Sequence, residues 1–335
     1  MRGWLWPPRD GESRVIEKPM PNQPFRIIML SDSEHERSEP MGSKENDWFL
    51  RPDSQLWLYK QRREGTGEDW AEKCASHLCD YLGLPHAVVE LAGWRVTQGI
   101  ATLNFVPKGA DLVHGNEKLA VLDPGYPGHG SGTRRFLRTP QHTIRRVFEA
   151  LSVDPVDPPP GWNPPSGIRS GADVFVGYLL LDAWIGNTDR HHGNWGFLSI
   201  PEEGSSRLCL APTFDHASSL GRNESDEKRA MRLTKKDQGF SVHAYAVEKC
   251  RSALYDSEGD RKPLTTIDAF GRGANIVPAA ALVWLDRLAA ISEGDIRELF
   301  GRIPPERISA PAADFAMSML AVTANALKEL AEQLR

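Results

Sequence analysis

The stretch that decides the fold is Asn187-Thr188-Asp189-Arg190-His191-His192-Gly193-Asn194. It follows an apolar run at residues 174–185, which predicts a buried helix that ends in a dense polar loop. Polar groups at the edge of a core need partners or a ligand, because an unpaired buried polar group costs free energy. Functional residues also concentrate on loops that rigid elements hold. The sequence therefore predicts a functional loop at residues 187–194.

The residues after this loop predict a β-hairpin. Residues 195–200 and 208–211 have the character of short strands, and a turn that contains glycine separates them. Because a hairpin returns the chain to its starting point, we expect Asp215 to lie beside Asp189 and Asn194. Two carboxylates and an amide supply the hard oxygen ligands that Mg²⁺ shares with substrate phosphates. In protein kinases a base Asp is followed five residues later by a metal-binding Asn, and a second Asp holds metal.

The motifs around this loop carry a family resemblance. They are Asp189-Arg190-His191 with Asn194, then Phe214-Asp215-His216 and Ser218-Ser219-Leu220-Gly221. From about residue 26 to its end, the chain resembles the HipA-like serine/threonine kinases of bacterial toxin–antitoxin systems. The Asp-Arg-His order is also similar to phosphatidylinositol kinases, so it indicates the wider kinase-like superfamily. The resemblance implies an α+β, bilobal protein-kinase-like fold, with a small antiparallel-sheet N-lobe carrying one helix and a larger, mostly helical C-lobe.

The composition is that of a globular protein. The 335 residues are 40% hydrophobic and 25% charged, with a net charge of -5. We expect an N-terminal arm at residues 1–24, an N-lobe that binds ATP at 25–107, and a catalytic C-lobe at 108–335. The acidic balance argues against direct binding of nucleic acid. The four cysteines form no Cys-x-x-Cys pair, and no apolar run has the length of a membrane span, so a cytoplasmic protein is expected.

The N-lobe provides candidates for binding phosphates. After a first strand at residues 25–30 and a polar connector at 31–40, the step Gly42-Ser43-Lys44 leads into two strands around a turn. Such a loop can cover phosphates with its backbone amides, although an ordinary hairpin has the same pattern. The resemblance implies that Ser43 can be autophosphorylated.

A lysine and a helix glutamate are the next candidates. Lys60 ends the strand at residues 55–60, where it can point towards phosphates, although a solvated lysine is the commoner case. A helix is predicted at residues 70–82 with Thr66 as its N-cap. Glu72 is the expected ion-pair partner of Lys60, and Glu68 is the alternative. A strand lysine held by a helix glutamate is the kinase arrangement for binding phosphate oxygens.

Two further strands, at residues 88–92 and 99–107, complete the predicted antiparallel sheet. Asn104, Phe105 and Val106 lie where a kinase hinge accepts the adenine edge through backbone groups. A plain strand exit before Pro107 is equally compatible with the sequence.

Helices dominate the expected C-lobe. They are predicted at residues 143–151, 282–291, 296–300 and 312–334, in addition to 174–185. The charged segment at residues 222–238 lies where kinases keep an activation or substrate-docking segment. A solvated loop would have the same composition.

Together these residues predict transfer of the ATP γ-phosphoryl group to a protein hydroxyl. Asp189 would orient the hydroxyl and accept its proton, and Asn194 and Asp215 would hold Mg²⁺. Lys60 would bind phosphate oxygens, and positioning and positive charge would supply most of the catalysis. His191 is a further candidate for cofactor binding, and the resemblance implies that it braces the loop by hydrogen bonding.

The resemblance also implies partners. It points to a protein substrate, in that family typically an aminoacyl-tRNA synthetase, and to an antitoxin or other accessory protein. The sequence before Gly42 is too short for the separate N-terminal subdomain of full-length HipA, so we expect the compact form.

Three other functions remain open. A phosphatidylinositol or small-molecule kinase shares the motifs, although a lipid kinase is expected to show basic or apolar elements that face the membrane. A metal-dependent hydrolase would use ligands from the same loop: Asp189, His191, His192 and Asp215. A nucleotide-binding pseudokinase would keep the same residues and act as a scaffold.

Overall fold

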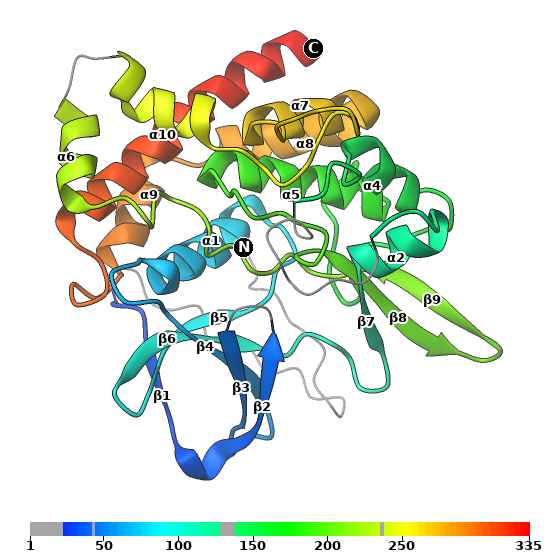
Figure 1. Cartoon of the computed structure of the whole chain (residues 1–335), viewed down its shortest axis with the longest axis horizontal. Helices are drawn as coiled ribbons and strands as arrows, with labels where there is room; N and C mark the ends of the chain where they lie inside the picture. Colours follow the sequence, from blue (N-terminus) through cyan, green and yellow to red (C-terminus); the bar gives the residue numbers. More distant parts are fainter. Residues whose placement is uncertain (1–22, 42–43, 128–137, 235–237) are drawn as a thin grey trace.

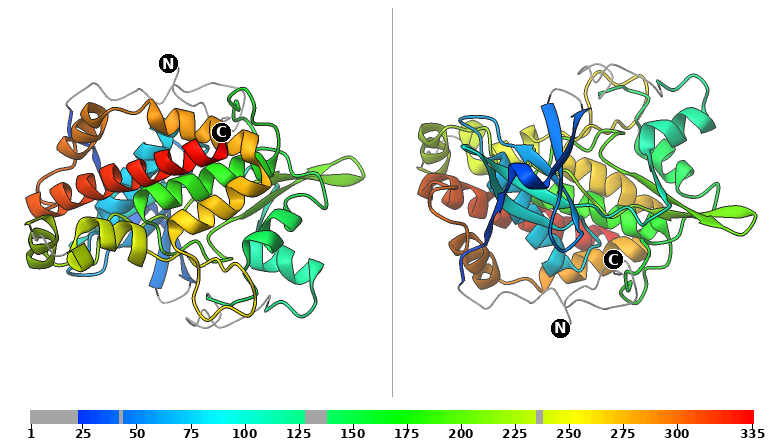
Figure 2. Two further views of the ribbon diagram at one scale, coloured as in Figure 1. Left: turned by 90° about the horizontal axis from the view of Figure 1, so that it is seen from above. Right: turned by 90° about the horizontal axis from the view of Figure 1, so that it is seen from below.

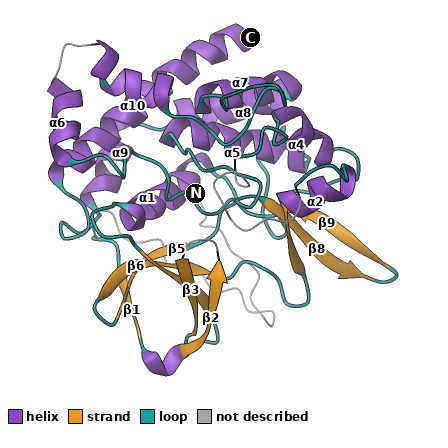
Figure 3. Ribbon diagram, in the orientation of Figure 1, coloured by secondary structure: helices purple, strands orange, loops and turns teal. Residues whose placement is uncertain are grey.

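Strands, one α-helix and a short 3₁₀ helix make up the described first part of the chain, and helices make up most of the rest (Figure 3). A computed structural model describes residues 23–41, 44–127, 138–234 and 238–335. The strands of the first part gather at one end of the molecule, and most helices lie at the other end (Figure 1). The expected bilobal arrangement is confirmed.

The N-lobe is built on a sheet whose described strands are β1 (Ile27–Leu30), β2 (His35–Met41), β3 (Lys44–Leu50), β4 (Leu56–Gln61), β5 (Val89–Trp94) and β6 (Thr97–Leu103). Their order is β1-β5-β6-β4-β3-β2. The sheet departs from the expected antiparallel pattern at one edge, because β1 and β5 are parallel, with Ile27 opposite Leu91. A long stretch of chain separates these two strands, so no tight hairpin imposes an antiparallel direction on them.

The strand β2 replaces most of the connector that we expected at residues 31–40. A short 3₁₀ helix, η1 (Asp32–Glu34), precedes it, and β2 then pairs with β3 along the edge of the sheet. The sequence of β2 is polar and contains Pro40. Both features are tolerated at a sheet edge, where one side of the strand faces solvent.

The helix α1 (Glu68–Leu82) packs the N-lobe against the C-lobe. It begins after Gly67, which has no side-chain cap, and not after Thr66 as expected. The hydroxyl of Thr66 instead donates to the carbonyl oxygen of Arg63 at 2.8 Å. The loop before α1 therefore uses the hydroxyl that would have capped the helix.

The C-lobe consists mainly of helices. The described ones are α2 (Gly115–Leu122), α4 (Ile144–Ala150), α5 (Gly171–Ile185), α6 (Asp226–Thr234), η2 (Gln238–Phe240), η3 (Ala244–Lys249), α7 (Thr266–Ile276), α8 (Pro278–Ala289), α9 (Glu293–Gly301) and α10 (Ala310–Leu334). Seen from above, α10 lies alongside α5 (Figure 2). The sequence did not predict α7, whose glycines make its helical pattern weak.

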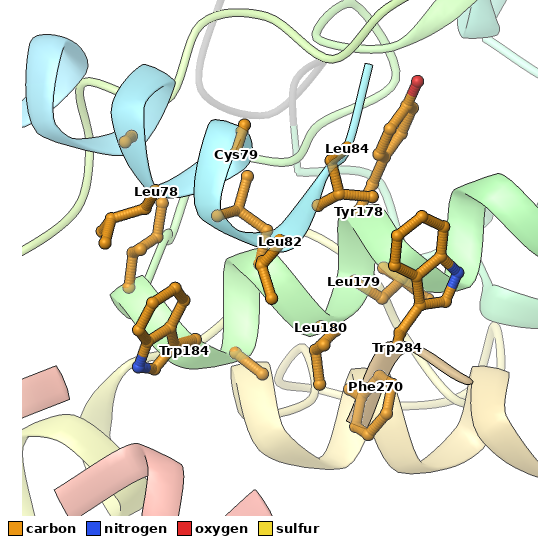
Figure 4. Close-up of a cluster of buried hydrophobic side chains, with 14 of the residues drawn as sticks. Leu78, Cys79, Leu82, Leu84, Tyr178, Leu179, Leu180, Trp184, Phe270 and Trp284 are labelled. Atoms are coloured by element: carbon orange, nitrogen blue, oxygen red, sulfur yellow. The ribbon is translucent and has the colours of Figure 1, made fainter. Parts of the chain in front are cut away.

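The helix α5 forms the centre of the core. The predicted buried helix is confirmed, and it begins slightly earlier, where the Ser170 hydroxyl accepts a hydrogen bond from the Asp173 N–H at 3.2 Å. Figure 4 shows α1, α5, α7 and α8 contributing to one apolar cluster. Its labelled members include Leu78, Leu82, Leu180, Trp184, Phe270 and Trp284. This packing fixes the C-terminal end of α5, from which the functional loop starts.

A small sheet beside the helices contains the predicted hairpin. Its strands are β7 (Asp111–His114), β8 (Gly196–Glu202) and β9 (Ser205–Leu210), in that order. Phe197 lies opposite Leu210, so the hairpin returns the chain to the end of the loop as expected. The turn contains Gly204 with a φ of +77°, a conformation that favours glycine.

The segment at residues 222–238 is not a solvated loop in its described part. It contains α6, in which Arg229 and Arg232 are buried. Arg229 donates to the carbonyl oxygens of Gly221 and Arg222 at 3.0 and 3.2 Å. The guanidinium of Arg232 lies over the ring of Tyr245. Among the described helices, none has both the length and the hydrophobicity that a bilayer span requires.

Candidate active site

A buried ion pair anchors the loop at residues 187–194 to α5. The guanidinium of Arg190 donates to both carboxylate oxygens of Asp182, at 2.7 and 2.8 Å. The same group donates to the carbonyl oxygen of Asn194 at 2.7 Å. Arg190 and Asp182 are 0% and 2% exposed, so each compensates the charge of the other. Arg190 therefore ties the end of the loop to α5.

Hydrogen bonds within the loop orient Asp189 and Asn194. The Asp189 N–H donates to the side-chain oxygen of Asn187 at 3.1 Å. The Asp189 carbonyl oxygen accepts hydrogen bonds from the Asn194 amide nitrogen at 2.9 Å and from the His191 N–H at 2.7 Å. Because the nitrogen of the Asn194 amide is used in this way, its oxygen is the atom suited to a metal ion.

The segment after the hairpin brings Asp215 to the loop. The Thr188 N–H donates to the carbonyl oxygen of Ser218 at 3.0 Å, which joins the two segments. Asp215 has a φ of +59°, a left-handed conformation that Asp adopts more readily than most residues. The carboxylates of Asp189 and Asp215 both act electrostatically on His191. The segment that carries Asp215 therefore adjoins the loop that carries Asp189.

Lys60 reaches the same place from β4 of the N-lobe. Its Nζ lies 3.0 Å from Oδ2 of Asp215. Burial disfavours the charged lysine, but the negative charges of Asp215 and Glu72 outweigh this effect and raise the pKa of Lys60. Burial likewise disfavours the charged Asp215, but Lys60 outweighs it and lowers the pKa of Asp215 to about 2. Both groups are therefore charged at neutral pH.

We expected Glu72 to form an ion pair with Lys60, and the structure shows other partners for both residues. Oε1 of Glu72 accepts a hydrogen bond from Nδ1 of His216 at 3.2 Å, while Lys60 pairs with Asp215. His216 follows Asp215 directly, so the turn that aims Asp215 at Lys60 aims its neighbour at α1. Oε2 of Glu72 is buried and has no hydrogen-bond partner in the described part of the chain.

The alternative partner, Glu68, is engaged elsewhere. Its carboxylate forms ion pairs with Arg222 and, at 3.6 Å, with Arg63. Arg222 lies seven residues after Asp215, so Glu68 connects the start of α1 to the segment beyond the hairpin.

The two histidines of the loop face different surroundings. Nδ1 of His191 accepts from the Gly193 N–H at 3.0 Å, which places the proton of the neutral ring on Nε2. Burial lowers the pKa of His191 and outweighs the opposing effect of Asp189 and Asp215. His191 therefore supports the loop as a neutral ring.

His192 is turned into the C-lobe. Its Nδ1 lies 2.7 Å from the hydroxyl of Tyr126, and burial, together with the nearby imidazoles of His191 and His114, lowers its pKa to about 4. No group of three or more His, Cys, Asp or Glu residues is placed to hold a metal ion among the described residues.

The expected hinge residues connect the N-lobe to the segment of Asp215. The Asn104 N–H donates to the carbonyl oxygen of Leu56 at 2.9 Å, and the Val106 N–H donates to Oδ1 of Asn104 at 3.1 Å. Phe105 stacks on Phe214, with ring centroids 5.4 Å apart. These two N–H groups are thus already engaged, and a nucleotide would use them only after rearrangement.

The remaining sequence candidates precede the strand β3. Gly42 and Ser43 lie outside the described residues. Lys44 begins β3, and its backbone pairs with Met41 of β2.

Sequence reasoning missed three residues of the site. Asp182 is one of them, and a charged residue inside an apolar helix was the signal that it needs a buried partner. His216 and Ser218 are the others, and the hydroxyl of Ser218 lies 3.5 Å from Oδ2 of Asp189. Both stand in quoted motifs, but only the fold shows what they contact.

Comparison with known proteins identifies the fold. No protein-family model and no curated protein sequence matches the chain. The proinflammatory kinase CtkA of Helicobacter pylori is similar in structure, with a TM-score of 0.70 and 19% identity over 92% of this chain and 98% of that chain. HipA of Shewanella oneidensis, in a complex with HipB and operator DNA, has a TM-score of 0.52 and 12% identity, over 99% and 70% of the two chains. The fold is therefore that of the bilobal kinases. Within that class it is the HipA-like kinase fold.

Proposed function

We propose that this chain is an ATP-dependent kinase of the HipA-like toxin type, which transfers the γ-phosphoryl group to a serine or threonine hydroxyl of a protein. The observation that carries the proposal is the meeting of Lys60 and Asp215 at 3.0 Å between the two lobes. The loop that presents Asp189 and Asn194 adjoins this pair. A strand lysine, a loop Asp and Asn, and a second Asp are the parts that phosphoryl transfer requires.

The residues fit a divalent metal ion. Asp215 and Asn194 supply a carboxylate and an amide oxygen, which are hard ligands suited to Mg²⁺. The ammonium of Lys60 already stands as a cation against the Asp215 carboxylate. The buried Oε2 of Glu72, which lacks a partner among the described residues, would offer that ammonium a second acceptor. A bound metal ion would supply positive charge to the phosphate oxygens.

The other residues orient the reactants. The carboxylate of Asp189 would align the acceptor hydroxyl and accept its proton. Lys60 would donate to phosphate oxygens, and the neutral His191 has its Nε2–H available for the same purpose. Glu72 would position Lys60 after the ammonium leaves Asp215.

The finer assignments rest on the family resemblance. We propose an aminoacyl-tRNA synthetase as substrate, autophosphorylation in the loop of Gly42 and Ser43, and an antitoxin as partner. The complex of the Shewanella oneidensis HipA with HipB supports the last of these. We retain the lobe boundary at residues 107 and 108. The free, buried state of all four cysteines supports a reducing compartment such as the cytoplasm.

The direct test is transfer of labelled phosphate from ATP in the presence of Mg²⁺. The wild type should label an acceptor protein on serine or threonine, and Asp189→Ala should not, although both unfold at nearly the same temperature. Wild-type turnover by Asp189→Ala would show that the assigned base is wrong. Labelling of phosphatidylinositol vesicles instead of protein would favour a lipid kinase, and ATP binding without any transfer would favour a pseudokinase.

A further inference from the structure

The hydroxyl of Ser218 lies between the proposed base and a buried arginine. It donates to Oδ2 of Asp189 across 3.5 Å. On its other side, Oγ of Ser218 accepts a hydrogen bond from the Arg222 guanidinium at 2.9 Å. Ser218 is thus the described side chain that hydrogen-bonds to the carboxylate of Asp189, while the other contacts described above hold the backbone of that residue.

The arginine gives this chain of contacts a direction. A guanidinium has only donors, so Arg222 must donate and the Ser218 oxygen must accept. The proton of the Ser218 hydroxyl is then left for the carboxylate of Asp189. The contact is long in the absence of substrate, and hydrogen bonds of this kind shorten when the reactants bind.

The position of Arg222 is itself fixed by α1. Its Nη1 donates to Oε1 of Glu68, in the first turn of the helix. The carbonyl oxygen of Arg222 accepts the Gly67 N–H at 3.2 Å. Arg222 and Glu68 are each 8% exposed, so the pair is shielded from solvent. A displacement of the start of α1 must therefore move Arg222 and Ser218.

We propose that Ser218 is a positioning residue, through which the contact between Glu68 and Arg222 sets the orientation of the Asp189 carboxylate. One oxygen of Asp189 is held by Ser218, and the other is left for the acceptor hydroxyl. The helix that carries Glu72 would thus control both sides of the site: the phosphate side through Lys60 and the acceptor side through Ser218. This inference rests on the proposed kinase activity.

The neighbouring residue supplies a matched control. Ser219 is 1% exposed, and within the described part of the chain its hydroxyl has no hydrogen-bond partner. Replacing Ser219 by alanine removes the same atom one residue away without touching Asp189. Any general effect of losing a serine hydroxyl from this segment should appear in both variants.

The test measures the steady-state transfer of labelled phosphate from ATP to casein, used as a generic acceptor protein. Ser218→Ala should lower kcat about 10- to 100-fold, because a hydrogen bond to a charged group is lost in the transition state. The KM for ATP should stay within about twofold of the wild type, because the nucleotide side of the site is intact. Ser218→Thr keeps a hydroxyl and should restore most of kcat, and Ser219→Ala should behave as the wild type.

A second comparison tests the connection to α1. Glu68→Gln should also lower kcat, and the double variant with Ser218→Ala should lose less than the product of the two single effects, because both act on one carboxylate. Equal kcat values for Ser218→Ala and Ser219→Ala would overturn the proposal, as would failure of threonine to restore activity. A wild type that transfers no phosphate would instead contradict the proposed function itself.

Discussion

The two sides of the candidate site are built differently. The loop at residues 187–194 is held by Arg190, which is completely buried and contacts both Asp182 and the loop backbone. The phosphate side depends on Lys60, which is paired with Asp215, while Glu72 is paired with His216. The side chains of Lys60 and Asp215 are 26% and 34% exposed.

The difference indicates which part of the site is preorganised. The acceptor side needs no ligand to keep its backbone in place, because the buried charges of Arg190 and Asp182 that anchor the loop are already paired. On the phosphate side, a metal ion would displace Lys60 from Asp215. Oε2 of Glu72 has no hydrogen-bond partner among the described residues and could then accept from Lys60. We infer that nucleotide binding rearranges Lys60 and leaves the catalytic loop in place.

Removal of the loop anchor should give the largest change in stability. In Asp182→Asn the buried Arg190 keeps its charge and loses its counterion, which should lower the free energy of unfolding by about 3–5 kcal/mol. Chemical denaturation measures this change. The exposed pair of Arg145 and Glu149 is the control, and Glu149→Gln should cost less than about 0.5 kcal/mol. If the two variants were equally stable, the loop would not depend on its anchor.

Neutralising Asp215 should affect activity more than stability. Asp215→Asn keeps a residue that tolerates the left-handed backbone and removes the charge. Phosphate transfer should fall about 100- to 1,000-fold, because the metal ion that would neutralise phosphate charge loses its carboxylate ligand. The unfolding temperature should change little, because Lys60 can reach solvent. A variant with full activity would remove Asp215 from the site.

The free energy of unfolding should also depend on pH, because His192 is buried beside the loop. The folded-state pKa of His192 is about 4, against an ordinary value of 6.5. His192 therefore binds a proton more readily in the unfolded chain than in the folded one. Its contribution to the free energy of unfolding is fully present above about pH 6.5 and is lost as the pH falls towards 4. The contribution of His192 is about 3 kcal/mol. Denaturation at several pH values should show this decline, and His192→Gln should reduce it. An unchanged slope in the variant would assign the decline to other groups.

The smallest effect is expected at Glu72. Glu72→Gln should raise the KM for ATP about tenfold, because Lys60 loses one of the three carboxylates that act on it. Glu90 is the control, since it pairs with Lys73 elsewhere in the N-lobe at 2.8 Å. Glu90→Gln should leave the KM for ATP unchanged. Equal KM values in both variants would mean that Glu72 has no part in binding phosphate.

The sequence predicted those parts of the site that depend on neighbouring residues. The buried helix, the polar loop and the hairpin follow one another directly, and the hairpin returns the chain to the end of the loop. Local periodicity and turn residues are sufficient for such elements.

Features that depend on distant contacts escaped prediction. The parallel pairing of β1 with β5 joins residues about sixty positions apart. The pairing of Glu72 with His216 joins residues of different lobes. No sequence pattern indicates that His216, and not Lys60, would contact the Glu72 carboxylate. The burial of Arg229 in α6 likewise follows from carbonyl groups that only the fold brings near.

The measurement that tests the central claim most directly is equilibrium binding of ATP to the wild type and to Asp215→Asn, each with and without Mg²⁺. The account predicts that Mg²⁺ strengthens binding of ATP to the wild type and has no such effect on Asp215→Asn. Equal strengthening by Mg²⁺ in both proteins would contradict it, because Asp215 and Lys60 would then not form the nucleotide site.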